Sequence, residues 1–364
     1  MRIAIIGGSG FIGSYTLLEL SKHHNDVTII DIRQPKKTFI THLDFNYIEC
    51  DICDRDKIKS IITQNDYDIV YHLAGVIRAD DCRKRPVRSC DVNLTGLINV
   101  LEACRNTNIK RFIFSSTTHI YSRCNDKNVV YENNTLTHNL HLYPGNKLCA
   151  ESIIMSYHML YDLPYTILRY SVAVGPYGHR DNVLSNFITK SLKHEDITIY
   201  NNGQIYRDFM YVEDHARGNA LAINSSAENE IINLSTKSIR LLDVAESVVK
   251  RTNSNSKIIT TEYNRVGDHD QIPVVSNSKA FKLLQWTPKY NIDHVIEQCI
   301  LYYQSDRLPL VDIAKIISEI TGRVIYTDSK PGAWDSLDVR NIVTSLEKRK
   351  YFRDAGLFID GYIF

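Results

Sequence analysis

The sequence has neither a large excess of one charge nor a long apolar run. Among its 364 residues, 43 basic side chains nearly balance 42 acidic ones, which leaves a net charge of +1. Such a chain has no strong field to attract polyanions, so we expect no nucleic acid and no anionic membrane as a partner. No stretch of about twenty apolar residues could cross a bilayer. The segment Met1–Gly8 contains an apolar run of strand length without a signal-peptide cleavage site, which predicts a cytoplasmic protein.

The sequence also lacks a second pair of cysteine or histidine residues with metal-binding spacing. Cys50 and Cys53 form a C-x-x-C pair among eight scattered cysteines. A tetrahedral zinc site would need two further ligands. A zinc site or a redox disulfide is therefore the weaker interpretation. We expect no metal, and reduced thiols on either side of a functional Asp51.

Short β-branched apolar runs alternate with amphipathic segments of helix length through the first half of the chain. This alternation predicts βαβ units and a parallel sheet. After Gly175 it gives way to loops rich in Asn, Asp and Gly, where a second lobe would lie. The predicted fold class is α/β, a Rossmann-like doubly wound parallel sheet with a smaller α/β C-terminal substrate lobe. The expected strands are Ile3–Ile6, Val27–Ile30, Ile69–Leu73, Phe112–Ser115 and Tyr165–Arg169, and the expected helices are Phe11–Ser21, Arg55–Gln64, Asn93–Thr107 and Asn146–Tyr161.

A glycine-rich turn, Gly-Gly-Ser-Gly-Phe-Ile-Gly, joins the first expected strand to the first expected helix. This is the context of a dinucleotide fingerprint: one glycine permits the tight turn, one lets the backbone approach the pyrophosphate, and one allows helix and strand to pack closely. Asp31 ends the second strand, where a carboxylate binds ribose hydroxyls and repels a 2′-phosphate. Arg33 could instead pair with such a phosphate. NAD is favoured over NADP, with a cofactor site made of Gly7, Gly10, Phe11, Ile12, Gly13 and Asp31.

The predicted domain organisation has three parts. Residues 1–170 form an NAD-binding Rossmann domain to which later segments return, 171–306 form the substrate-binding lobe, and 307–364 form a C-terminal extension. Leu242–Glu246 resembles Val311–Lys315, and a short apolar run follows each. Either the extension partly duplicates residues 240–300, or two generic helix–strand units look alike.

Tyr143 and Lys147 lie four residues apart, so both can occupy one side of a helix. A neighbouring cation and the positive ring of NAD favour phenolate, which predicts a tyrosine pKa below its usual value of about 10. Thr117, at the end of the strand Phe112–Ser115 and its hydroxyl-rich continuation, could hydrogen-bond the reacting oxygen. These three residues are the predicted acid–base group.

With these motifs the sequence resembles the nucleotide-sugar epimerase/dehydratase branch of the extended short-chain dehydrogenases/reductases, over roughly residues 1–300, and most closely the UDP-sugar 4-epimerases. The resemblance implies that Tyr143 deprotonates a sugar hydroxyl while hydride passes to NAD, that Lys147 holds the nicotinamide ribose and that Thr117 orients the substrate. It also implies a homodimer through two helices per subunit. Further implied cofactor contacts are Asp51, Ile52, Leu73, Ala74, Gly75, Asn93, Tyr143, Lys147 and Tyr170.

The second lobe carries two further motifs of that family. Arg207–Asp214 resembles R-D-F-x-x-V-x-D, whose arginine pairs with the substrate diphosphate. Arg265–Asp268 resembles R-x-G-D, whose arginine contacts phosphate and whose aspartate contacts the uridine ribose. Guanidinium groups suit phosphate oxygens geometrically. With the position of a diphosphate-binding asparagine added, the implied substrate residues are Thr117, Asn182, Arg207, Arg265 and Asp268.

The residues after Thr117 narrow the choice of reaction. Family dehydratases carry an Asp-Glu pair there, and the decarboxylases use that Glu, whereas this chain has Thr118 and His119. We therefore predict an isomerase of carbohydrate biosynthesis, an NAD-dependent nucleotide-sugar epimerase acting at C4 through a transient 4-keto intermediate. The alternatives are an NAD(P)-dependent reductase of a nucleotide keto-sugar and a non-catalytic NAD-binding scaffold. Val172 replaces a family asparagine, so the sugar is held differently or is not the usual one.

Overall fold

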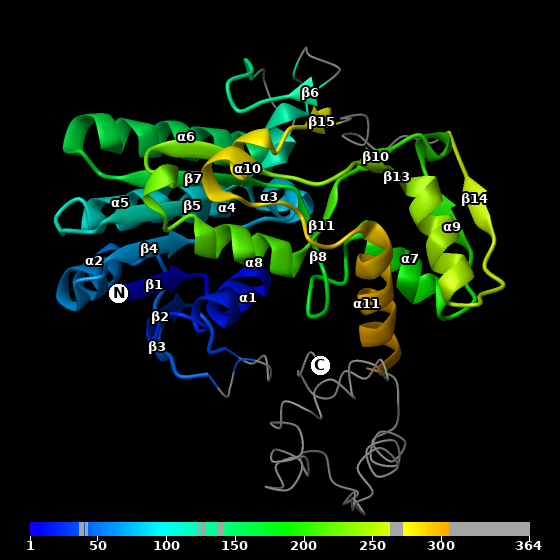
Figure 1. Cartoon of the computed structure of the whole chain (residues 1–364), viewed down its shortest axis with the longest axis horizontal. Coiled ribbons are helices and arrows are strands. Elements are labelled where there is room, and N and C mark those ends of the chain that lie inside the picture. Colours follow the sequence, from blue (N-terminus) through cyan, green and yellow to red (C-terminus); the bar gives the residue numbers. More distant parts are fainter. Residues whose placement is uncertain are drawn as a thin grey trace, which may run out of the picture.

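The computed structural model describes residues 1–35, 40, 43–122, 124, 129–136, 141–262 and 272–305. These residues form a central sheet with helices on both faces and a second lobe at one end, on the right in Figure 1. Within these ranges, no helix combines the length and the apolar character needed to span a bilayer.

The central sheet has seven strands in the order β12-β7-β5-β4-β1-β2-β3, and every neighbouring pair is parallel. The order reverses between β1 and β4, which is where a doubly wound sheet opens a ligand crevice. This confirms the predicted fold class, and each of the five predicted strands is present. The strands are β1 (Arg2–Ile6), β2 (Asp26–Asp31), β3 (Asn46–Glu49), β4 (Ile69–His72), β5 (Arg111–Thr117), β7 (Tyr165–Tyr170) and β12 (Glu230–Leu234).

Two apolar cores cover the two faces of the sheet. One lies under α1 (Phe11–Leu20), α8 (Val212–Leu221) and α10 (Ser278–Leu284), and the other lies under α2 (Arg55–Asn65), α5 (Gly96–Cys104) and α6 (Leu142–Tyr161). Two predicted helices differ in their bounds by more than one residue. The helix expected from Asn93 starts as a π-helical segment, η2 (Asp91–Thr95), before α5. Helix α6 begins four residues earlier than expected, so that Tyr143 lies in its first turn.

The second lobe has a core of its own between helices α7, α9 and α11 and short strands (Figure 1). Strand β14 pairs with β9, and β11 pairs with β8, both parallel. The tail in which a duplication was predicted lies outside the described residues. The remaining elements are α3 (Ala79–Lys84), α4 (Pro86–Cys90), η3 (Thr118–Tyr121), β6 (Val129–Val130), β8 (Val172–Val174), α7 (Val183–Ser191), β9 (Ile197–Ile199), η4 (Asn201–Gly203), β10 (Tyr206–Arg207), β11 (Phe209–Tyr211), η5 (Ser225–Ala227), β13 (Ile239–Arg240), α9 (Leu241–Arg251), β14 (Ile258–Thr260), β15 (Val274–Val275) and α11 (Ile292–Ser305).

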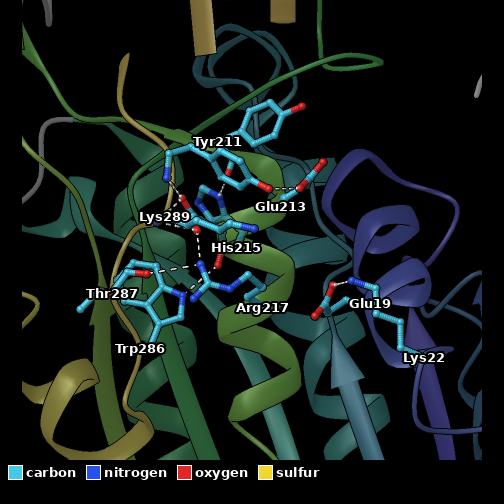
Figure 2. A network of polar contacts seen from close by, with 11 residues as sticks. Glu19, Lys22, Tyr211, Glu213, His215, Arg217, Trp286, Thr287 and Lys289 are labelled. Atoms are coloured by element: carbon cyan, nitrogen blue, oxygen red, sulfur yellow. Dashed lines mark hydrogen bonds and ion pairs between the residues drawn. The ribbon is translucent and has the colours of Figure 1, made fainter. Parts of the chain in front are cut away.

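Buried polar contacts around Asp214 tie the first turn of α8 to the segment that leads into α11. The Asp214 carboxylate accepts the backbone N–H of Lys289 at 2.9 Å and pairs with Arg217, and its carbonyl accepts the indole N–H of Trp286 at 3.0 Å. Figure 2 shows Arg217, Trp286 and Lys289 converging at this point. Trp286 is fully buried. The last residue of the R-D-F-x-x-V-x-D motif is therefore an architectural group that joins the second lobe to the sheet.

Candidate active site

A cavity of about 840 Å³ opens at the carboxyl edge of the sheet, and both the sheet and the second lobe line it. It spans the ends of β1, β2, β4, β5 and β7. Most of the predicted site residues meet there. Those that line it are Gly7, Gly10, Phe11, Ile12, Gly13, Asp31, Asp51, Ile52, Leu73, Ala74, Gly75, Thr117, Tyr143, Lys147, Tyr170 and Asn182.

The glycine turn forms a cradle with no room for side chains. Gly7 has a φ of +84°, and a Cβ atom there would lie 2.5 Å from the backbone nitrogen of Ala74. A Cβ on Gly13 would lie 2.4 Å from the carbonyl oxygen of Gly7. The backbone is thus bare at the amino end of α1, where the helix dipole favours an anion. The cavity therefore fits the pyrophosphate of a dinucleotide.

Backbone N–H groups hold the Asp31 carboxylate at the end of β2. One oxygen accepts the N–H of Ser9 at 3.1 Å, and the other accepts the N–H of Arg33 at 3.2 Å. A carboxylate at the end of this strand can accept hydrogen bonds from ribose hydroxyls. Arg33 lines the same cavity, so the two side chains expected to compete over cofactor choice do share it.

We expect Asp31→Ala to shift cofactor preference from NAD toward NADP. Loss of charge-assisted hydrogen bonds to ribose costs about 1.5–3 kcal/mol, roughly ten- to a hundredfold in NAD affinity. Removing the carboxylate also removes its repulsion of a 2′-phosphate, which Arg33 can then approach. Calorimetric titration with NAD and with NADP measures the ratio of the two dissociation constants. Asp26→Ala, at the exposed opposite end of β2, is the matched control, and an unchanged ratio in Asp31→Ala would contradict the assignment.

Asp51, the next predicted cofactor residue, is held by an arginine that the sequence did not reveal. Its carboxylate accepts the backbone N–H of Cys53 at 2.9 Å and pairs with Arg88 at 3.1 Å. Burial acts in the opposite direction, but the Cys53 N–H and the Arg88 guanidinium together lower the pKa of Asp51.

All eight cysteines are free thiols, and burial raises the pKa of Cys50 to about 11. In the described part of the chain, no group of three or more His, Cys, Asp or Glu side chains could hold a metal ion.

Asn93 does not reach the cavity that it was predicted to line. Its amide donates to the carbonyl of Val76 at 2.9 Å and accepts the N–H of Val76 at 2.7 Å. The side chain is buried behind the loop that carries Leu73, Ala74 and Gly75. The structure therefore shows Asn93 as a support of this loop, and its direct contact with the cofactor stays a prediction.

Thr117, Tyr143 and Lys147 come together between the end of β5 and the first two turns of α6. The Thr117 side chain lies near the Tyr143 phenol and favours its ionised form, and the Lys147 ammonium donates to the carbonyl of Ser115 at 2.6 Å. Burial raises the pKa of Tyr143 to about 12, although Thr117 acts against this rise. The predicted lowering of this pKa included the positive ring of NAD, whereas the protein alone holds the phenol protonated. The lysine is itself buried and faces Ser115, so it does not offset the desolvation of the phenolate.

The two residues after Thr117 offer no acidic pair. The Thr118 hydroxyl donates to the carbonyl of Tyr170 at 3.3 Å and is buried. His119 lines the cavity, but desolvation, with smaller effects from Arg207 and His141, lowers its pKa to about 4. Its imidazole is therefore neutral near pH 7 and is a poor proton donor.

The predicted substrate residues are only partly assembled in the described structure. Asn182 lines the cavity, but its amide caps α7 by accepting the N–H of Ser185 at 2.8 Å and donating to the carbonyl of His179 at 2.6 Å. Arg207 is not among the residues that line the cavity, and its guanidinium donates to the carbonyl of Tyr206 at 2.9 Å. Arg265 and Asp268 lie outside the described residues. Val172 lines the cavity at the start of β8, so an apolar side chain occupies the place of the family asparagine.

Beside Val172, Asp208 is a buried carboxylate that makes stability depend on pH. Desolvation raises its pKa to about 7, with the Thr236 N–H and the Ser171 hydroxyl acting against the rise. A raised folded-state pKa stabilises the protonated form, so this contribution is complete below pH 4 and is lost as pH rises to about 7. We expect Asp208→Asn to be more stable than the wild type at pH 8, by at most a few kcal/mol, and to lose that advantage toward pH 4. Urea unfolding at both pH values tests this, with exposed Asp56→Asn as control, and a pH-independent difference would contradict it.

The fold and the site together define a dinucleotide-dependent enzyme, because a doubly wound sheet carries a glycine cradle at its switch point and a Thr–Tyr–Lys group at its carboxyl edge. The chain belongs to the NAD dependent epimerase/dehydratase family, whose sequence profile matches residues 3–235. This membership confirms the resemblance seen in the sequence. The family's dependence on NAD confirms the predicted cofactor.

This chain aligns with individual relatives over nearly their whole length. A putative UDP-glucose 4-epimerase of Methanocaldococcus jannaschii is 28% identical over 84% of this chain and 99% of its own. A UDP-N-acetyl-alpha-D-glucosaminuronate decarboxylase of Bacillus cytotoxicus is 27% identical over 83% and 98%. The solved UDP-glucose 4-epimerase of Thermotoga maritima with UDP-glucose has a TM-score of 0.78 at 26% identity, covering 84% of this chain and 99% of its own. These relatives differ in their named reactions. The similarity therefore establishes the enzyme family, and the reaction has to be inferred from the residues of the site.

Proposed function

We propose that this protein is an NAD-dependent epimerase of a nucleotide-activated sugar that acts at C4 through a transient 4-keto intermediate. The observation that carries the proposal is a single cavity that joins the glycine cradle and Asp31 to Thr117, Tyr143 and Lys147. Such a cavity brings a dinucleotide and a sugar hydroxyl to the same acid–base group.

Each residue of the catalytic group has a separate task. Tyr143 removes the proton from the C4 hydroxyl of the sugar and later returns it to the same oxygen. The configuration at C4 inverts because the hydride comes back to the other face of the keto sugar. Thr117, which lies near Tyr143, aligns the reacting oxygen. Lys147 holds the ribose next to the nicotinamide when the cofactor is bound. NAD, when bound, supplies the reversible hydride acceptor. Additional positive charge in the cavity lowers the raised pKa of Tyr143, so the tyrosine becomes an effective base only in the loaded enzyme.

The neighbours of Thr117 favour epimerisation over elimination. Loss of water from a sugar needs an acid and a base besides the tyrosine. Here the corresponding positions hold a buried threonine and a neutral histidine. An epimerase needs neither, since one tyrosine serves both half-reactions.

We propose that residues 1–170 with β12 hold the cofactor and that the lobe of residues 171–306 binds the nucleotide sugar. In the lobe, Asn182, Arg207, Arg265 and Asp268 are the proposed substrate contacts. Helices α5 and α6 form the proposed homodimer face, because Ile98 of α5 and Met159 and Leu160 of α6 are exposed apolar side chains.

The proposal is tested by incubating the purified enzyme with UDP-, dTDP-, GDP- and CDP-sugars without added nicotinamide cofactor. Mass spectrometry and proton NMR then identify the products. We expect a product of unchanged mass with one inverted hydroxyl. Loss of water or of carbon dioxide would contradict epimerisation. Turnover only with NADH or NADPH and a keto-sugar would make the enzyme a reductase, and no turnover at all would make it a scaffold.

A further inference from the structure

A buried ion pair lies directly behind the catalytic group. Glu151 of α6 and Arg169 of β7 are 1% and 3% exposed at their side chains. The guanidinium donates to one carboxylate oxygen from Nε at 3.0 Å and to the other from Nη2 at 2.7 Å. This two-point geometry fixes direction as well as distance. The pair links the catalytic helix to a strand whose last residue, Tyr170, lines the cavity.

The same carboxylate also binds the strand that carries Thr117. The hydroxyl of Ser116 donates to Glu151, and Ser116 immediately precedes Thr117 on β5. On the far side of the pair, Arg169 donates to the hydroxyl of Tyr121 and to the carbonyl of Glu132. Glu151 therefore connects α6 to both strands that approach the reacting atoms.

Glu151 also shares one face of α6 with the two catalytic residues. Tyr143, Lys147 and Glu151 follow at intervals of four residues, so Lys147 lies one turn from each neighbour. Burial lowers the pKa of Lys147 to about 8, and Glu151 is the largest influence that opposes this loss of charge. Three other titratable groups lie near Lys147 in the described structure. Tyr143 lies one turn earlier on the same face, Cys82 has a weaker effect in the same direction as Glu151, and His72 is neutral because burial lowers its pKa to about 3.

We infer that Glu151, held by Arg169 and Ser116, is a positioning residue for the catalytic lysine: it fixes α6 against β5 and β7 and supplies the negative charge that keeps Lys147 an ammonium ion. This inference rests on the proposed function for its effect on turnover, but not for its effect on the lysine. Its chemistry requires only that a buried ammonium without a nearby anion gives up its proton more readily.

The test is a direct titration of Lys147 in the full chain, by NMR of lysine side chains labelled with carbon-13 and assigned with Lys147→Met. We expect the midpoint of Lys147 to fall by about one to three pH units in Glu151→Gln. The matched control is Glu102→Gln, because Glu102 accepts a hydrogen bond from Tyr157 of the same helix but is remote from Lys147. An unchanged midpoint in Glu151→Gln would overturn the inference, even if the enzyme proves to be an epimerase.

Turnover gives the second readout. Glu151→Gln should lower kcat more than it changes KM and should move the descending limb of the kcat profile to lower pH. Ser116→Ala and Arg169→Lys keep the Glu151 charge, so they should lower kcat without moving that limb. Should Glu151→Gln fail to fold, these two variants decide the matter: wild-type kcat in both, or a shifted limb in either, would overturn the inference. Absence of turnover in the wild type would instead contradict the proposed function and leave the lysine titration valid.

Discussion

Replacement of Tyr143 by phenylalanine is expected to lower the turnover of a nucleotide sugar by about a thousandfold, within the 10²- to 10⁴-fold range of a lost acid–base group. The substitution removes one oxygen from a half-buried side chain on the first turn of α6. The glycine cradle and Asp31 are untouched, so NAD should remain bound. Turnover is measured by NMR with the sugar identified in the panel, and NAD content is measured after release by denaturation.

The control for this experiment is Tyr157→Phe in the same helix. The Tyr157 hydroxyl donates to Glu102 at 2.6 Å, and Tyr157 does not line the cavity. The two variants lose the same atom, so only its position differs. Turnover above a tenth of the wild-type rate in Tyr143→Phe, with NAD still bound, would show that another group moves the proton.

The pH dependence of turnover should reflect the same residue. Without cofactor, burial sets the pKa of Tyr143 at about 12, far above neutrality. A phenol of this kind is almost wholly protonated at pH 7, so we expect catalysis near neutrality to depend on positive charge brought in by the cofactor. We therefore expect little deprotonation of alcohols before NAD is bound.

Sequence periodicity was sufficient to predict the centre of the fold. The five predicted strands are apolar and β-branched because helices cover both sides of the sheet. Strand β3 escaped this pattern because its residues, Asn46–Glu49, lie at the sheet edge and are partly exposed. The glycine turn and the Tyr–Lys pair could also be predicted from the sequence, since each depends on local backbone geometry alone.

The groups that tune the site were harder to predict because they come from distant segments. Arg88 lies 37 residues after Asp51, and no sequence pattern connects the two. Arg169 did leave a signal, since a charged residue inside the apolar strand Tyr165–Tyr170 requires a buried partner. Glu151 left another, as the third member of a four-residue repeat. The direction of the Tyr143 pKa could not be derived from spacing, because it depends on how much protein surrounds the hydroxyl.

A single methyl group on Gly7 is expected to abolish useful binding of NAD. The residue has a φ of +84°, which costs an L-amino acid about 1–2 kcal/mol. The added Cβ would lie 2.5 Å from the backbone nitrogen of Ala74, and such overpacking costs about 1–3 kcal/mol. The turn can relieve the backbone strain and the overpacking only by moving away from β4. This movement would distort the cofactor site. The combined loss of roughly 2–5 kcal/mol corresponds to a thirtyfold or greater weakening of NAD binding.

Calorimetric titration of Gly7→Ala with NAD, together with thermal unfolding without NAD, separates loss of the site from loss of the fold. Gly145→Ala is the matched control, because no heavy atom lies within 4 Å of the position that its Cβ would take. Gly145 lies within α6, where alanine favours the helix, so this variant should bind NAD normally and unfold no earlier than the wild type. An unchanged affinity for NAD in Gly7→Ala would mean that the loop after β4 can move away from the glycine turn. It would also mean that pyrophosphate binding does not require a glycine at position 7.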